Sequence, residues 1–156
     1  MPSFQIIASA SQPFEHLFQL TDDQLKAIGA VRRFATENPG FPCRVSLEDA
    51  DVGEELLLVP YEHHAVVSPY RASGPIFIRR GAKQKYLPAG EVPDYVTRRL
   101  ISARAYDKEH MMIAAAVCEG DAVAAEIERF FADGEVAYIQ LHNAKQGCFS
   151  CQVNRI

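Results

Sequence analysis

The sequence predicts an α+β fold, a largely antiparallel or mixed sheet of six to eight strands with two helices packed on it. Most of the apolar segments are short and are separated by turn residues, which is the pattern of strands that follow one another through turns. Residues 56–59 and 111–118 are apolar at successive positions, which indicates strands covered on both faces. Only residues 121–132 have a helical pattern long enough to connect parallel strands, so a doubly wound α/β fold is not expected.

The first forty residues predict two strands with a short helix between them. The strands are expected at residues 4–8 and 31–36. Thr21 and Gln24 have the spacing of a capping box, in which each side chain bonds to the backbone N–H of the other residue. This places the start of the helix at Thr21, and Gly29 is expected to end it.

The middle of the chain is its most strand-like part. Residues 43–47 alternate between apolar and polar side chains and predict a strand, as do the apolar residues 56–59 and 76–78. The acidic residues 48–54 lack the spacing of a calcium-binding loop and are expected to form a solvated turn. Residues 60–74 are polar and contain prolines, so we expect a long connection of the kind that often carries a function.

The segment before the last hairpin predicts extended structure followed by a helix. Residues 95–106 are expected to be extended, and residues 111–118 form the second strand that is apolar on both faces. Asp121 is expected to cap a helix over residues 121–132, and Gly134 is expected to end it. The apolar side chains of this helix recur with helical spacing and form one stripe: Val123, Ile127, Phe130 and Phe131.

Composition and charge argue against several classes of function. The chain has 156 residues, which favours a single domain over residues 1–156. Its formal net charge of −4 argues against a nucleic-acid-binding protein, which needs a basic surface. No apolar run reaches the ~20 residues of a membrane span and no signal peptide is evident, so we expect a cytoplasmic protein. The spacing of the four cysteines does not match a zinc site, and no motif predicts a metal or cofactor.

The final nineteen residues, 138–156, predict a β-hairpin with two reactive side chains opposite each other. Residues 143–147 include asparagine and glycine and suit a five-residue loop. His142 and Cys148 would then flank the loop on the outward, polar face, with Cβ atoms ~4.5–5.5 Å apart. A histidine within hydrogen-bond distance activates a thiol as a nucleophile, so these two residues are the predicted catalytic pair. The alternative is a polar cross-strand pair with no catalytic role.

A second candidate site is a pocket for an anion. Arginine offers a planar pair of donors to a carboxylate or a phosphate, and Arg71 lies in the polar connection 60–74. The residues predicted to bind a ligand are Arg44, His63, Tyr70, Arg71, Ser73 and Asn143. In the alternative interpretation Arg71 pairs with a nearby carboxylate such as that of Glu62, and Arg44 faces outward or pairs with a carboxylate.

Three segments of the chain read PGFPCRVSLEDADVGEELLLVPYEH, SPYRASGPIFIRR and YIQLHNAKQGCFSCQV. These segments resemble a family of bacterial proteins of about this length that is known only as a domain of unknown function, and the resemblance extends over nearly the whole chain. It implies a bacterial single-domain protein, and it assigns no catalytic role to any residue.

Three functions follow as hypotheses. The favoured one is a domain that binds a small anionic molecule. The second is an enzyme that acts on a small molecule through Cys148 as nucleophile and His142 as base, with Arg71 or Arg44 holding an anionic group of that molecule. The third is an interaction module in which two copies of the chain form a homodimer through their sheet edges.

Overall fold

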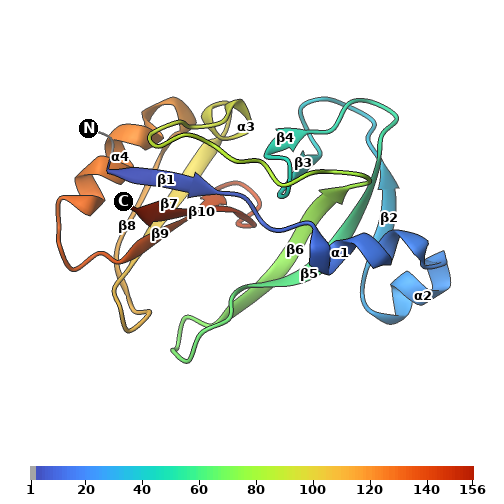
Figure 1. Ribbon diagram of the computed structural model, residues 1–156, viewed down its shortest axis with the longest axis horizontal. Coiled ribbons are helices and arrows are strands. Elements are labelled where there is room, and N and C mark those ends of the chain that lie inside the picture. The colour runs from blue at the N-terminus through green and yellow to red at the C-terminus, as the bar shows by residue number, and fades with distance from the viewer. Residues whose placement is uncertain (1–2) are drawn as a thin grey trace.

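The computed structural model describes residues 3–156 and contains two five-stranded β-sheets that lie next to each other (Figure 1). In the first sheet all neighbours are antiparallel, and their order is β1 (Phe4–Ile7), β10 (Phe149–Arg155), β9 (Tyr138–Asn143), β7 (Leu100–Tyr106) and β8 (Met112–Glu119). The second sheet has the order β2 (Val31–Phe34), β5 (Glu55–His64), β6 (Ala72–Arg79), β3 (Pro42–Cys43) and β4 (Glu48–Asp49). Within it, only the pairing of β6 with β3 is parallel among the strands that the structure describes.

Each sheet packs against its own short helices. The second sheet is accompanied by α1 (Gln12–Glu15), a 3₁₀ turn at His16–Gln19 and α2 (Asp22–Ala27). The first sheet is accompanied by α3 (Asp94–Thr97), a 3₁₀ turn at Gly120–Ala122 and α4 (Val123–Phe131). The predicted α+β class with antiparallel and mixed pairing is therefore confirmed, and the two predicted helices are present as α2 and α4, together with the short helices α1 and α3. The prediction of one sheet of six to eight strands is wrong.

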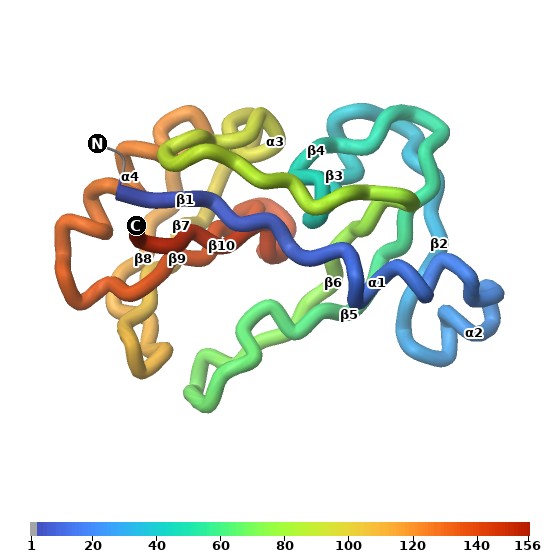
Figure 2. The backbone as a smooth tube through the Cα atoms, viewed as in Figure 1, coloured from blue at the N-terminus to red at the C-terminus, as the bar shows by residue number. Residues whose placement is uncertain are grey.

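The path of the chain explains why there are two sheets. The chain starts in the first sheet with β1, crosses to build the whole second sheet, and returns after β6 to complete the first (Figure 2). The two crossing segments contact each other, because Gln84 Nε2 donates to the carbonyl oxygen of Ala8 at 2.9 Å and Ile7 forms an isolated bridge with Tyr86. Strand β1 consequently pairs with β10, the last strand of the chain.

Most of the features that the sequence predicted for the helices are present. The capping box is confirmed, since the Thr21 backbone N–H donates to Gln24 Oε1 and the Gln24 N–H donates to Thr21 Oγ1. The predicted apolar stripe of α4 is buried against the first sheet. Asp121 is not the cap that was predicted, because it lies inside the 3₁₀ turn and α4 begins after Ala122.

Two predicted segments have a different structure. Most of the predicted connection 60–74 belongs to β5 and β6, which extend as a two-stranded ribbon and leave residues 65–71 as the loop. Residues 43–47 were predicted to be a strand, but only Cys43 belongs to β3. The four residues after it form a turn, in which the Leu47 N–H donates to the Cys43 carbonyl oxygen. All five of these side chains are buried, so the alternation of apolar and polar residues did not report two different faces.

Strand β8 is an edge strand and not the fully covered strand that the sequence predicted. Its side chains alternate between partly buried and exposed positions, and Ile113 and Val117 are on the exposed face. The small alanines between them allow a strand that is apolar throughout to lie at an edge, because little apolar area is exposed per residue. The homodimer that two copies of the chain would form through their sheet edges stays a prediction.

Candidate functional site

A cleft of about 780 Å³ lies between the two sheets and brings together several of the predicted residues. It is bordered by the β9–β10 loop of the first sheet, by the turn after β3 and by part of the β5–β6 ribbon of the second. Five of the eight residues that the sequence singled out line it: Arg44, His63, Ser73, Asn143 and Cys148. The other three, Tyr70, Arg71 and His142, are not part of its lining.

Arg44 is one of the residues that join the two sheets at this cleft. It lies in the turn after β3, and its side chain is 1% exposed. The turn is anchored on the neighbouring segments, because the Arg44 N–H donates to the Phe77 carbonyl oxygen and its own carbonyl oxygen accepts from the Ser9 N–H. From this position the guanidinium reaches from the second sheet into the first.

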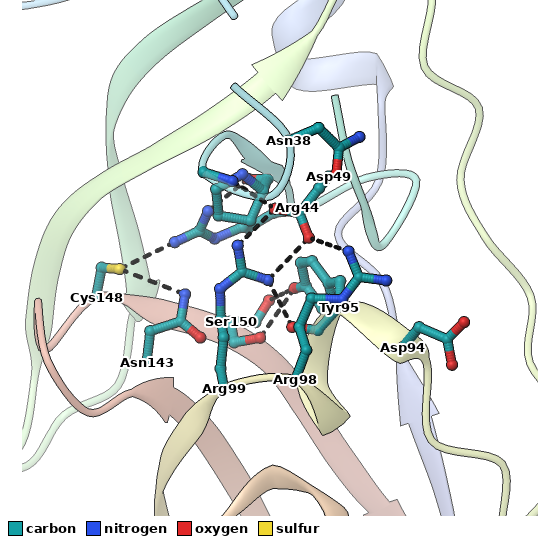
Figure 3. A network of polar contacts seen from close by, with 12 residues as sticks. Asn38, Arg44, Asp49, Asp94, Tyr95, Arg98, Arg99, Asn143, Cys148 and Ser150 are labelled. Atoms are coloured by element: carbon teal, nitrogen blue, oxygen red, sulfur yellow. Dashed lines mark hydrogen bonds and ion pairs between the residues drawn. The ribbon is translucent and has the colours of Figure 1, made fainter. Parts of the chain in front are cut away.

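The guanidinium of Arg44 makes three hydrogen bonds. Its Nε donates to the carbonyl oxygen of Phe149 at 2.7 Å and its Nη1 donates to that of Pro42. Its Nη2 donates to the sulfur of Cys148 at 3.1 Å (Figure 3). A guanidinium has five N–H groups, so two are left without a hydrogen bond to the part of the chain that the structure describes.

The charge of Arg44 has no carboxylate partner among residues 3–156. Both alternatives considered for Arg44, an outward orientation and an ion pair with a carboxylate, are therefore wrong. A buried positive charge without a negative partner is unfavourable, because the interior replaces the lost hydration only in part. The described structure thus leaves one buried positive charge at the wall of a cleft.

Cys148 is half-buried and lines the cleft. Besides the Arg44 guanidinium, the Nδ2 of Asn143 points at this sulfur, at 3.8 Å. Asn143 is itself buried, and its Oδ1 accepts no hydrogen bond from any residue that the structure describes. The part of the cleft around Cys148 therefore contains a thiol that faces two N–H donors, and a buried acceptor oxygen that has no donor among the described residues.

The hairpin differs by one residue from its predicted register. Its loop has four residues, 144–147, because the Asn143 N–H donates to the Cys148 carbonyl oxygen and pairs these two residues. His142 consequently lies opposite Phe149 and not opposite Cys148. A shift of one residue moves a side chain to the other face of a sheet, so the predicted pairing of His142 with Cys148 is wrong.

His142 is 1% exposed, whereas the sequence placed it on an outward face. Its Nδ1–H donates to the Gly147 carbonyl oxygen at 3.2 Å, and its Nε2 lies 3.4 Å from Gln140 Oε1. Burial, with a smaller contribution from the charge of Arg104, lowers the pKa of His142 to about 3. The ring is neutral near pH 7 and a weak proton acceptor, which does not suit the general base of the predicted pair.

The lowered pKa of His142 predicts a loss of stability in acid. In the unfolded chain its pKa is about 6.5, so between about pH 6.5 and 3 the unfolded state binds more protons than the folded state. The free energy of unfolding should fall by about 1.4 kcal/mol per pH unit from this group, or roughly 2–3 kcal/mol between pH 6.5 and 4.5. Urea unfolding at pH 7 and 4.5 should show a smaller loss in His142→Gln than in the wild type.

The matched control for this experiment is His16→Gln, which removes an exposed histidine. It should lose as much stability between the two pH values as the wild type. Burial also lowers the pKa of His63, so some acid sensitivity should persist in His142→Gln. Equal losses in His142→Gln and the wild type would contradict the assignment.

The remaining predicted ligand residues divide between the cleft and the surface. Arg71 forms an exposed ion pair with Glu62, Nε to Oε2 at 2.8 Å, as the alternative interpretation expected. Tyr70 contributes its carbonyl oxygen, which accepts from His64 Nδ1 at 2.7 Å. His63 lines the cleft with its ring stacked on Phe149, at 5.3 Å between centroids, and donates from Nδ1 to Gln140 at 3.0 Å.

The sequence did not identify several charged residues at the cleft. Arg98, Arg99 and Lys145 line it together with one carboxylate, that of Glu119. The first two bind Asp49, whose side chain is 1% exposed although the sequence placed it in a solvated turn. The adjacent pair Arg98-Arg99 was the available signal, but nothing in the sequence indicated its partner. With two arginines neutralised in part by Asp49, the lining still has an excess of positive charge.

Two other classes of site are not found in the part of the chain that the structure describes. Among residues 3–156 no group of three or more His, Cys, Asp or Glu side chains is placed to hold a metal ion. No helix within that range combines the length and the hydrophobicity that a bilayer crossing requires.

One comparison with known proteins identified a match. A family model described as "Protein of unknown function (DUF1203)" matches residues 40–155. This range contains the three segments that resembled an uncharacterised family, except for Pro39 at the start of the first. No curated protein and no solved structure matches the chain.

Proposed function

The chain belongs to the DUF1203 family of proteins of unknown function, and we propose that the cleft between its two sheets binds a small anionic molecule. One observation carries the proposal: the guanidinium of Arg44 is buried at the wall of the cleft without a carboxylate partner among the described residues. Buried charges in proteins are paired, so the missing negative charge is expected from a ligand.

The size of the electrostatic effect is sufficient to matter. Two unit charges about 5 Å apart interact by about 3 kcal/mol at an effective dielectric constant of 20. Arg44 is almost completely covered, so an anion in the cleft would interact with its charge across Cys148 and Asn143. Lys145, which is exposed in the β9–β10 loop and lines the same cleft, is available for direct contact.

Asn143 narrows the class of ligand. A buried acceptor without a donor costs about 1–3 kcal/mol, and a ligand that donates to Oδ1 would recover this. We therefore propose a ligand that combines a carboxylate or phosphate with a hydroxyl or amino group. The polar and apolar groups of the lining, including the ring of Phe149 and the hydroxyl of Ser73, suit a small organic anion better than an inorganic ion alone.

The proposal predicts that lactate stabilises the protein more than propionate does. The two carboxylates have the same charge and differ by one hydroxyl group, which is the donor that Asn143 Oδ1 requires. At ten times its dissociation constant a ligand stabilises the native state by about 1.4 kcal/mol, or about 3–5 °C in the melting temperature. Thermal unfolding with each sodium salt at equal ionic strength measures the difference.

Lys145→Gln and Lys108→Gln are matched variants for this test, because both remove one exposed lysine and only the first changes the cleft. Lys145→Gln should reduce the shift caused by lactate, and Lys108→Gln should leave it unchanged. Equal shifts with lactate and propionate that neither variant changes would contradict the proposed site.

A further inference from the structure

We infer that Cys148 is a nucleophile, which forms a covalent bond with an electrophilic carbon of an anionic molecule bound in the cleft. The inference rests on the proposed function, since the anion-binding cleft would supply the reactant. It assigns to Cys148 a mechanism without His142, the base that the sequence suggested. The residues that act on the sulfur are Arg44 and Asn143.

The surroundings of the Cys148 sulfur are those of a reactive thiol. Arg44 Nη2 donates to it at 3.1 Å and Asn143 Nδ2 lies at 3.8 Å, so two N–H groups and one positive charge face it. A neighbouring cation and hydrogen-bond donors stabilise the negative charge on sulfur that makes it nucleophilic. Cys148 is nevertheless not fully covered, because it is half-buried and lines the cleft.

The other three cysteines lack this combination. Cys43 and Cys151 are buried, and burial raises the pKa of Cys151 to about 12. Cys118 is half-buried like Cys148, but burial and three nearby carboxylates, those of Glu126, Glu119 and Asp121, raise its pKa. Cys118 therefore provides an internal control, a second half-buried cysteine in an environment of the opposite charge.

A second observation points independently to a ligand near this sulfur. Asn143 lines the cleft, and its buried Oδ1 has no donor among the described residues. In Figure 3 the Nδ2 of this amide points toward the Cys148 sulfur and Oδ1 points away from it, so a ligand group that donates to Oδ1 would lie on the other side of the amide. A ligand held there would be separated from the thiol by one amide group.

The step is a nucleophilic substitution. The sulfur forms a bond to the electrophilic carbon, the bond from that carbon to its leaving group breaks, and the leaving group departs with the bonding electron pair. The thiol proton passes to solvent water. With iodoacetate as a probe, the product is the carboxymethyl thioether of Cys148 and the leaving group is iodide.

Alkylation by iodoacetamide and iodoacetate, followed at each cysteine by peptide mass spectrometry at pH 7, tests the inference. With iodoacetamide, which is neutral, Cys148 should react about tenfold faster or more than Cys118. The ratio of the iodoacetate rate to the iodoacetamide rate should be about fivefold higher at Cys148 than for glutathione, because the cleft attracts the carboxylate. Lactate should slow both reactions at Cys148.

The two proposals fail in different ways. If Cys148 reacts with iodoacetamide no faster than Cys118, the inference that Cys148 is a nucleophile is wrong, whatever the ratio of the iodoacetate rate to the iodoacetamide rate. A fast Cys148 with a rate ratio equal to that of glutathione and no protection by lactate would overturn the anion site and leave the nucleophile.

Two variants test the assigned neighbours of the sulfur. Asn143→Asp has nearly the same shape and places a negative charge beside Cys148, so it should reduce the iodoacetamide rate and the rate ratio. Arg44→Met, if its circular dichroism is native, should slow alkylation about tenfold; if it does not fold, Asn143→Asp decides alone. Lys108→Gln should react as the wild type does, and unchanged rates in Asn143→Asp would contradict the assignment.

Discussion

Replacing Arg44 by methionine is expected to lower the free energy of unfolding by about 3 kcal/mol. The substitution keeps most of the side-chain volume but removes the donors to the carbonyl oxygens of Phe149 and Pro42, each of which costs about 1–3 kcal/mol when buried and unpaired. Removal of a buried charge offsets part of this loss. For a chain of this length the melting temperature should fall by about 6–12 °C. Urea unfolding followed by circular dichroism measures the change.

Arg71→Met is the matched control, because it removes an arginine from an exposed ion pair with Glu62. Exposed ion pairs contribute about 0–1 kcal/mol, so this variant should remain close to the wild type. A loss below about 1 kcal/mol in Arg44→Met would show that the guanidinium does not hold the two sheets together at the cleft.

Replacing Gly120 by alanine is expected to destabilise the protein by about 3 kcal/mol or more, because overpacking against backbone cannot relax cheaply. A Cβ at this position would overlap the carbonyl oxygen of Val96 and lie within 2.7 Å of those of Thr97 and Arg99. These atoms belong to the end of α3 and the residues after it, which hold Arg98 and Arg99 at the cleft. Thermal unfolding measures the effect.

Gly134→Ala serves as the control for Gly120→Ala, because a Cβ at Gly134 would meet no atom within 4 Å. It should change the free energy of unfolding by about 0.5 kcal/mol or less. If both alanine variants unfolded at the same temperature, the close approach of the backbone at Gly120 would not be a constraint on this fold.

The sequence predicted local elements better than their assembly. The capping box at Thr21 and the stripe of α4 depend on residues three to eight positions apart, and both are confirmed. The division into two sheets depends on the pairing of β1 with β10, at opposite ends of the chain, which no local pattern encodes. Likewise the pattern at residues 43–47 has the period of a strand, but tertiary contacts bury all five side chains in a turn.

For the candidate site the sequence identified residue types but not their geometry. It singled out Arg44, Asn143 and Cys148, but Arg44 and Cys148 are 104 positions apart, and no local pattern indicates that their side chains are hydrogen-bonded. The error at His142 has a simple cause, since a loop one residue shorter than assumed exchanges the partner across the hairpin. The register of the hairpin therefore places Cys148 opposite Asn143 and not opposite His142.

Titration of the ¹⁵N-labelled protein with lactate, followed by amide chemical shifts, tests the anion-binding cleft most directly. Saturable shifts should appear at the amides of Asn143, Lys145 and Cys148, which border the cleft, and they should be weaker with propionate. The account would be contradicted by the absence of shifts at these amides with lactate on the order of 50 mM. It would also be contradicted by shifts confined to residues 79–85, a segment with four basic side chains: Arg79, Arg80, Lys83 and Lys85.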